Sequence, residues 1–162
     1  MFPSLFTAAH VAISLAGIGS GLVVVYGLIT GKRFDAWTAL FLVSTVATSA
    51  TGFFFPFERF LPSHAVGIVS LLVLAVAILA RYTRRLAGAW RLAYVISAVV
   101  ALYLNVFVLI AQLFLKVPAL KQIAPTQSEP PFLVAQLVVM AFFTVFAIAA
   151  AIKFRIEPVR TA

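Results

Sequence analysis

The sequence predicts an all-α, polytopic membrane protein with five transmembrane helices, and three observations predict it. Hydrophobic residues make up 64% of the 162 residues and charged residues only 10%, whereas a water-soluble domain is about 25% charged. Uncharged stretches of about 20 residues recur along the chain, and each is long enough to cross a hydrocarbon layer of ~30 Å as a helix. These stretches lack the polar–apolar alternation of membrane β-strands, and in lipid only helices and closed barrels satisfy every backbone polar group.

Taken in order, the apolar runs predict one helical bundle covering residues 1–162, with spans at about 5–30, 36–56, 61–80, 92–115 and 131–152. A basic turn at 31–33 closes the first span, and Asp35 is expected to be the N-cap of the second. Pro62 and Ser63 suit the start of the third span. An arginine-rich turn follows it, and a polar loop at 116–130 precedes the last span.

The charges predict the orientation of the bundle. Five spans place nine basic residues on one side and three on the other. The larger group is Lys32, Arg33, Arg81, Arg84, Arg85, Arg91, Lys153, Arg155 and Arg160, and the smaller is Arg59, Lys116 and Lys121. Because basic loops stay in the cytoplasm, we expect the N-terminus outside and the C-terminus inside. Loops beside anionic lipid account for the net charge of +8, so nucleic acid is not an expected partner.

Small and hydroxyl-bearing residues predict which helix faces pack together. His10, Ser14, Gly17 and Gly21 fall on one line of the first span. Glycines at this spacing let a neighbouring backbone approach closely, so His10 is expected to point into the bundle. The second span carries a matching stripe, made of Thr38, Thr45, Ser49 and Gly52 with Thr48 beside it.

Two amides on the fourth span, Asn105 and Gln112, share a helix face. An amide in hydrocarbon costs several kcal/mol unless it is paired, so both should face the interior. One interpretation is a hydrogen bond between helices. The other is a contact with a ligand, such as the edge of a quinone or a porphyrin. Gln136 on the fifth span has the same two interpretations.

The candidate site lies where the two histidines are expected to meet. His10 opens the first span and His64 opens the third, and both helices run inward, so both imidazoles should lie near the outer boundary. Glu58 precedes His64 in the phenylalanine-rich loop at 51–64, and Glu129 lies in the outer loop before the last span.

Three chemistries could use this arrangement. Two neutral imidazoles could ligate a b-type haem, with Asn105 and Gln112 contacting the cofactor. Alternatively His10 and His64, joined by Glu58 or Glu129, could bind a metal such as zinc, iron or copper. A proton relay or pH sensor is the third. Both histidines could also lie at the headgroup boundary with a purely structural role.

Three segments carry a resemblance to known proteins. Residues 51–67, 103–107 and 116–132 resemble small bacterial multi-spanning inner-membrane proteins with no established function. The likeness covers most of the chain. It implies a location in the bacterial inner membrane and brings no activity with it.

The leading functional hypothesis is therefore a redox or cofactor-binding membrane module that uses His10 and His64. The alternative is a non-enzymatic scaffold or accessory subunit, associated with a membrane-protein partner or a second copy of itself. A small channel or transporter component is the third hypothesis. The absence of cysteine excludes thiolate chemistry, and no hydrolase or phosphate-loop motif occurs.

Overall fold

The computed structural model describes residues 4–56, 59–60 and 62–156, and within these ranges every regular element is a helix. The helices are α1 (Leu5–Ile29), α2 (Asp35–Gly52), α3 (Pro62–Ile78), the π-helical turn η1 (Leu79–Thr83), α4 (Ala89–Lys116), α5 (Pro118–Ile123) and α6 (Pro130–Ile156). Five helices are long and apolar enough to cross a membrane: α1, α2, α3 with η1, α4 and α6. The prediction of an all-helical chain with five helices long and apolar enough to span a membrane is confirmed, and α5 is an additional short helix inside the expected loop.

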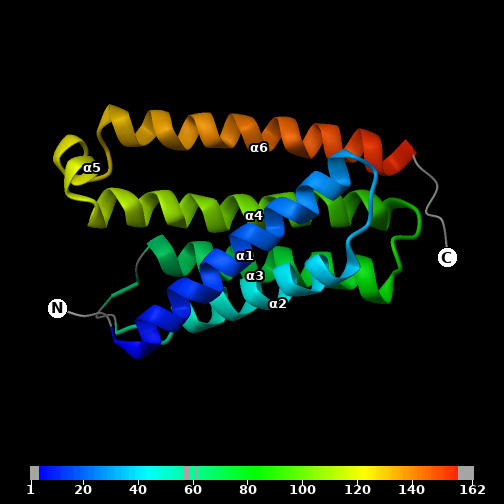
Figure 1. Ribbon diagram of the computed structural model, residues 1–162, viewed down its shortest axis with the longest axis horizontal. Coiled ribbons are helices and arrows are strands. Elements are labelled where there is room, and N and C mark those ends of the chain that lie inside the picture. Colours follow the sequence, from blue (N-terminus) through cyan, green and yellow to red (C-terminus); the bar gives the residue numbers. More distant parts are fainter. Residues whose placement is uncertain (1–3, 57–58, 61, 157–162) are drawn as a thin grey trace.

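The bundle is arranged around α4, which packs against α1, α3 and α6 (Figure 1). Helix α2 lies beside α3, and α1 crosses obliquely over α2, α4 and α6. Successive helices alternate in direction, so α1 begins at one end of the bundle and α6 finishes at the other (Figure 1). We call these the histidine end, which holds His10, His64 and Lys116, and the arginine end, which holds Arg33 and Arg81.

Close packing of α1 on α2 and α4 depends on glycine. A Cβ atom at Gly21 would lie 2.6 Å from Leu102 Cδ1 on α4 and 2.9 Å from the Phe41 ring on α2. At Gly27 it would lie 2.8 Å from the Phe34 ring. Side chains would therefore force the helices apart, and the predicted small-residue face of α1 is confirmed as a packing face.

The α1–α2 contact keeps one antiparallel register over most of its length. From the histidine end inward, His10 meets Thr51, Ser14 meets Thr48, Gly17 meets Thr45, and Gly21 meets Phe41. Each successive contact lies further along α1 and further back along α2, as in any antiparallel pair of helices. The hydroxyl stripe of α2 thus faces the glycine line of α1, and polar pairs near the histidine end give way to apolar ones further in.

The hydrophobic part of the core begins at Phe41 and continues toward the arginine end. Its largest fully buried side chains include Phe41, Leu74, Tyr94, Val95, Val99 and Leu102. Helix α6 adds Phe143, Ala150 and Phe154 to this core. Large apolar side chains such as Leu137, Phe142 and Val145 remain exposed on α6, which fits a surface in contact with lipid.

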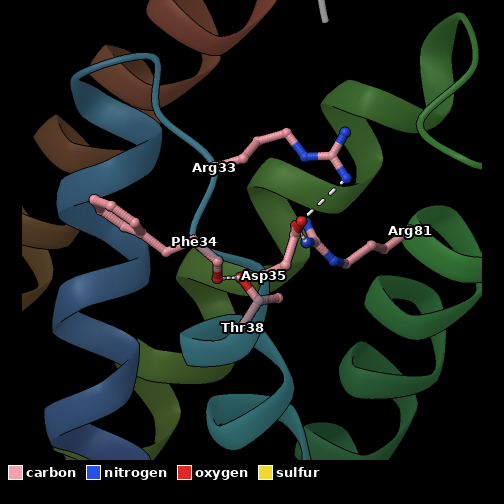
Figure 2. Close-up of polar contacts among 5 residues, drawn as sticks. All are labelled: Arg33, Phe34, Asp35, Thr38 and Arg81. Carbon is pink, nitrogen blue, oxygen red and sulfur yellow. Dashed lines mark hydrogen bonds and ion pairs between the residues drawn. The ribbon is translucent and has the colours of Figure 1, made fainter. Parts of the chain in front are cut away.

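A buried arginine organises the arginine end. Arg81 lies on η1 with its side chain 5% exposed, and it donates a hydrogen bond to the Asp35 carboxylate. Its guanidinium lies over the rings of Tyr94 and Tyr82, at 5.3 and 5.7 Å from their centroids. Figure 2 shows Asp35 between Arg81 and Arg33, whose Nη2 is 3.5 Å from the same oxygen.

The expectation that Asp35 caps α2 was wrong. The cap position is Phe34, with no side-chain cap hydrogen bond, and Asp35 is the first helical residue. The Phe34 carbonyl accepts a hydrogen bond from Thr38 Oγ1 at 2.8 Å (Figure 2). The position of Asp35 just before an apolar run suggested a cap. The sequence alone could not show that its carboxylate would form an ion pair with Arg81.

Gly21→Ala should destabilise the bundle, whereas Gly19→Ala should not. The added methyl group at Gly21 meets Leu102 and Phe41, and such overpacking costs about 1–3 kcal/mol of unfolding free energy. A Cβ at Gly19 meets nothing within 4 Å. Thermal unfolding in mild detergent should show a lower Tm for the first variant only, and equal Tm values for both would contradict the packing.

Asp35→Asn should be more destabilising than Arg33→Gln. The first removes the anionic partner of a buried guanidinium, which costs about 1–3 kcal/mol. The second breaks a solvent-exposed pair at 3.5 Å, which is worth about 0–1 kcal/mol. Denaturation of the two variants under the same conditions would measure the difference, and a larger loss for Arg33→Gln would rule out Arg81 as the main partner.

Candidate cofactor-binding site

A cavity of about 490 Å³ lies at the histidine end between α1, α2, α3 and α4. All four residues predicted to contact a cofactor line it: His10, His64, Asn105 and Gln112. Most of the remaining wall is apolar, with hydroxyls from α1, α2 and α3. This volume and this mixture are typical of small-molecule sites, which measure roughly 300–1,000 Å³ and carry a few placed polar groups.

The hydrogen bond from His10 to α2 indicates which nitrogen of the neutral imidazole carries the proton. His10 lies in the second turn of α1, and its Nδ1 is 2.8 Å from Thr51 Oγ1. The Thr51 hydroxyl donates its one proton to the Ala47 carbonyl at 2.7 Å, so toward His10 it can only accept. This hydrogen-bond network favours the His10 tautomer with its proton on Nδ1, which leaves Nε2 as a hydrogen-bond acceptor or metal ligand.

His64 is held among aromatic rings. It lies in the first turn of α3, is 6% exposed, and packs between Phe53 and Phe60 with ring centroids 5.7 and 5.6 Å away. Phe53 reaches this position because Gly67 has no side chain, since a Cβ there would lie 3.1 Å from the ring. Phe55 contacts the His10 ring edge-on at 5.0 Å. Phe53, Phe55 and Phe60 of the phenylalanine-rich loop thus contact the two imidazoles.

The inner end of the cavity contains two polar atoms without partners. Thr45 Oγ1 and Asn105 Nδ2 are both buried and make no hydrogen bond within the described ranges of the chain. Each would lie 3.2 Å from a Cβ atom placed on Gly17, so they converge over this glycine. Asn105 faces the interior as predicted, but its amide nitrogen does not form the interhelical hydrogen bond that was one interpretation.

Gln136 does form such a bond. Its Nε2 donates to the Phe107 carbonyl on α4 at 3.2 Å, and the residue is 8% exposed. The structural interpretation therefore applies to the amide of α6. The two amides of α4 instead border the cavity, which keeps the ligand-binding interpretation open for them.

The predicted acidic residues are placed differently from the histidines. Glu129 accepts hydrogen bonds from Thr126 Oγ1 at 2.7 Å and from the Ser128 amide at 3.1 Å, so its carboxylate stabilises its own loop before α6. Glu58 lies outside the described residues. Among those that are described, no group of three or more histidine, cysteine, aspartate or glutamate side chains could hold a metal ion. A metal site that includes Glu58 stays a prediction.

Sequence reasoning missed two residues of chemical importance for the site. Thr51 orients His10 from α2, and Lys116 brings a cation to the cavity wall. Thr51 could have been found by pairing the two stripes in antiparallel register. Lys116 was assigned to the outer loop, whereas it is the last residue of α4 and reaches the cavity.

Comparison of the chain with protein-family models, with curated proteins and with solved structures gives no match. The role of the cavity is therefore argued from its own residues.

The pKa of Glu129 should rise when the Thr126 hydroxyl is removed. Hydrogen bonds, chiefly from this hydroxyl, hold that pKa below its usual 4.5. Because the folded pKa is the lower one, the carboxylate stabilises the loop above the unfolded pKa, and this contribution is lost as pH falls through the folded value. Carboxyl NMR of glutamate-labelled protein should show a higher pKa in Thr126→Val and an unchanged one in Thr126→Ser. Equal values in both variants would exclude the hydroxyl as the cause.

Proposed function

We propose that this protein is a membrane-embedded module that binds one lipid-soluble redox cofactor in the cavity at the histidine end. The observation that carries the proposal is the convergence of His10, His64, Asn105 and Gln112, from three helices, on one cavity. Binding sites between the helices of a bundle are built in this way, from side chains on facing helices.

The chemistry of His10 supports a cofactor that needs a neutral imidazole. Its proton is committed to Thr51, and a histidine whose second nitrogen is held by such a partner is a well-oriented ligand. For a b-type haem, His10 and His64 are the residues that would hold the iron, and Lys116 could pair with a carboxylate of the macrocycle. When bound, haem supplies one-electron chemistry.

The proposal includes a location and an orientation. Seven described basic residues gather at the arginine end: Lys32, Arg33, Arg81, Arg84, Arg85, Arg91 and Lys153. This excess supports a cytoplasmic arginine end and an outward histidine end. The resemblance of the sequence supports the inner membrane of a bacterium. The cavity would then face the periplasmic boundary, within reach of molecules dissolved in the outer leaflet.

Protein purified gently from cells supplied with ample haem should carry a redox-active cofactor. An oxidised-minus-reduced difference spectrum would show a haem, and an organic extract of the same sample would show a reducible lipid-soluble compound. His10→Ala and His64→Ala should each lower the cofactor content at least about tenfold, since loss even of a partner that orients a metal ligand costs roughly 10–100-fold in affinity.

Lys121→Ala is the matched control, because this lysine lies on α5 at the same end of the bundle but does not line the cavity. It should leave the cofactor content unchanged. Wild-type protein that yields neither a haem spectrum nor a redox-active compound in the extract would contradict the proposal. That result would favour the alternative role as a scaffold or accessory subunit.

A further inference from the structure

The inner end of the cavity has its own chemistry, distinct from that around the histidines. Gly17 lies seven residues beyond His10 on α1, roughly 10 Å deeper along the helix axis. Thr45 on α2 and Asn105 on α4 approach this point from two sides. Thr45 is only 1% exposed, yet its hydroxyl has no hydrogen-bond partner within the described ranges, and it lines the cavity.

Two buried polar atoms without hydrogen-bond partners lie close together at the inner end of the cavity, so we expect a ligand atom that bonds to both. Buried polar atoms in folded proteins almost always have a hydrogen-bond partner, because an unpaired one carries its full desolvation cost. Asn105 Nδ2 can only donate, and the Thr45 hydroxyl can donate as well as accept. An acceptor that enters the cavity can therefore serve both atoms, since both residues line it. A Cβ on Gly17 would lie 3.2 Å from each of them and from Ser44 Oγ, whose proton goes to the Leu40 carbonyl, so both donors lie close against the α1 backbone.

The depth of this point restricts the acceptor to a neutral oxygen. A charged carboxylate is costly within the hydrocarbon region, and Lys116 near the cavity mouth is a more suitable partner for one. The oxygens of a b-type haem all belong to its carboxylates. A quinone instead carries neutral carbonyl oxygens on a flat, apolar body, and the cavity wall is largely apolar.

We infer that the cofactor of this cavity is a quinone-class compound, with one carbonyl oxygen accepting hydrogen bonds from Asn105 Nδ2 and Thr45 Oγ1 at the inner end. This inference rests on the proposed function, since it identifies the cofactor that the cavity binds. A buried water molecule would present the same acceptor chemistry, so the test separates the two sources.

Binding of decylubiquinone to the purified, delipidated protein in mild detergent tests the inference. We expect Asn105→Leu and Thr45→Val each to weaken binding about five- to tenfold, the effect of losing one buried hydrogen bond. Affinity for decylbenzene, a hydrocarbon without carbonyl groups, should not change in either variant. Gly17→Ala should also weaken quinone binding, because a Cβ atom 3.2 Å from each donor would force both to shift.

Thr144→Val is the matched control. Thr144 lies on α6 outside the residues that line the cavity, and its hydroxyl donates a hydrogen bond to the Met140 carbonyl at 2.8 Å. Quinone binding should therefore be unchanged. Unlike a disruptive core substitution, Asn105→Leu and Thr45→Val should raise the Tm of the ligand-free protein, because each removes an unpaired buried polar group. Higher stability with weaker quinone binding is the combined result expected of a ligand site.

The outcomes separate this inference from the function on which it rests. If wild-type protein binds decylubiquinone and both variants bind it equally well, water occupies the inner end and the inference is overturned while the proposed function stands. The same holds if the protein carries haem and binds no quinone. If it binds neither, both fail.

Discussion

The close antiparallel contact between α1 and α2 is the constraint on which the rest of the structure depends. It exists because Gly21 and Gly27 leave no side chain between α1 and the rings that face it. With the two backbones this close, the polar residues of α1 fall opposite the hydroxyls of α2, and His10 receives its partner Thr51. Nearer the histidine end, residues of α1, α2 and α4 line the inner part of the cavity.

Buried polar groups are treated differently at two places in the bundle. At the arginine end the buried guanidinium of Arg81 has Asp35 and two aromatic rings as partners. At the inner end of the cavity two polar atoms have none among the described residues. Between them, Phe41 and Leu102 form a fully buried apolar layer against Gly21, one helical turn beyond Gly17. A cavity that is closed by such a layer is better suited to holding a ligand than to conducting one across the bundle.

Helical periodicity predicted much of the candidate site. Asn105 and Gln112 were selected because an amide in an apolar helix must face inward, and His10 and His64 because both open helices that run inward. All four line one cavity. The acidic partners were less predictable. Glu129 was grouped with the histidines because it lies in a loop on the same side, but local hydrogen bonds to Thr126 and Ser128 determine its position. Asp35 was taken for a cap because its partner, Arg81, is 46 residues away.

The sequence by itself determined that the chain forms apolar helices, how many could span a membrane, and which residues face inward. These properties follow from composition and from the 3.6-residue period, because a backbone in lipid must satisfy its own hydrogen bonds. Only the tertiary structure decided that Thr51 sets the proton of His10, that Asn105 and Thr45 converge without a partner, and that Arg81 holds Asp35. Each of these depends on distances between helices, which the packing of small and large side chains sets and the periodicity of one helix does not contain.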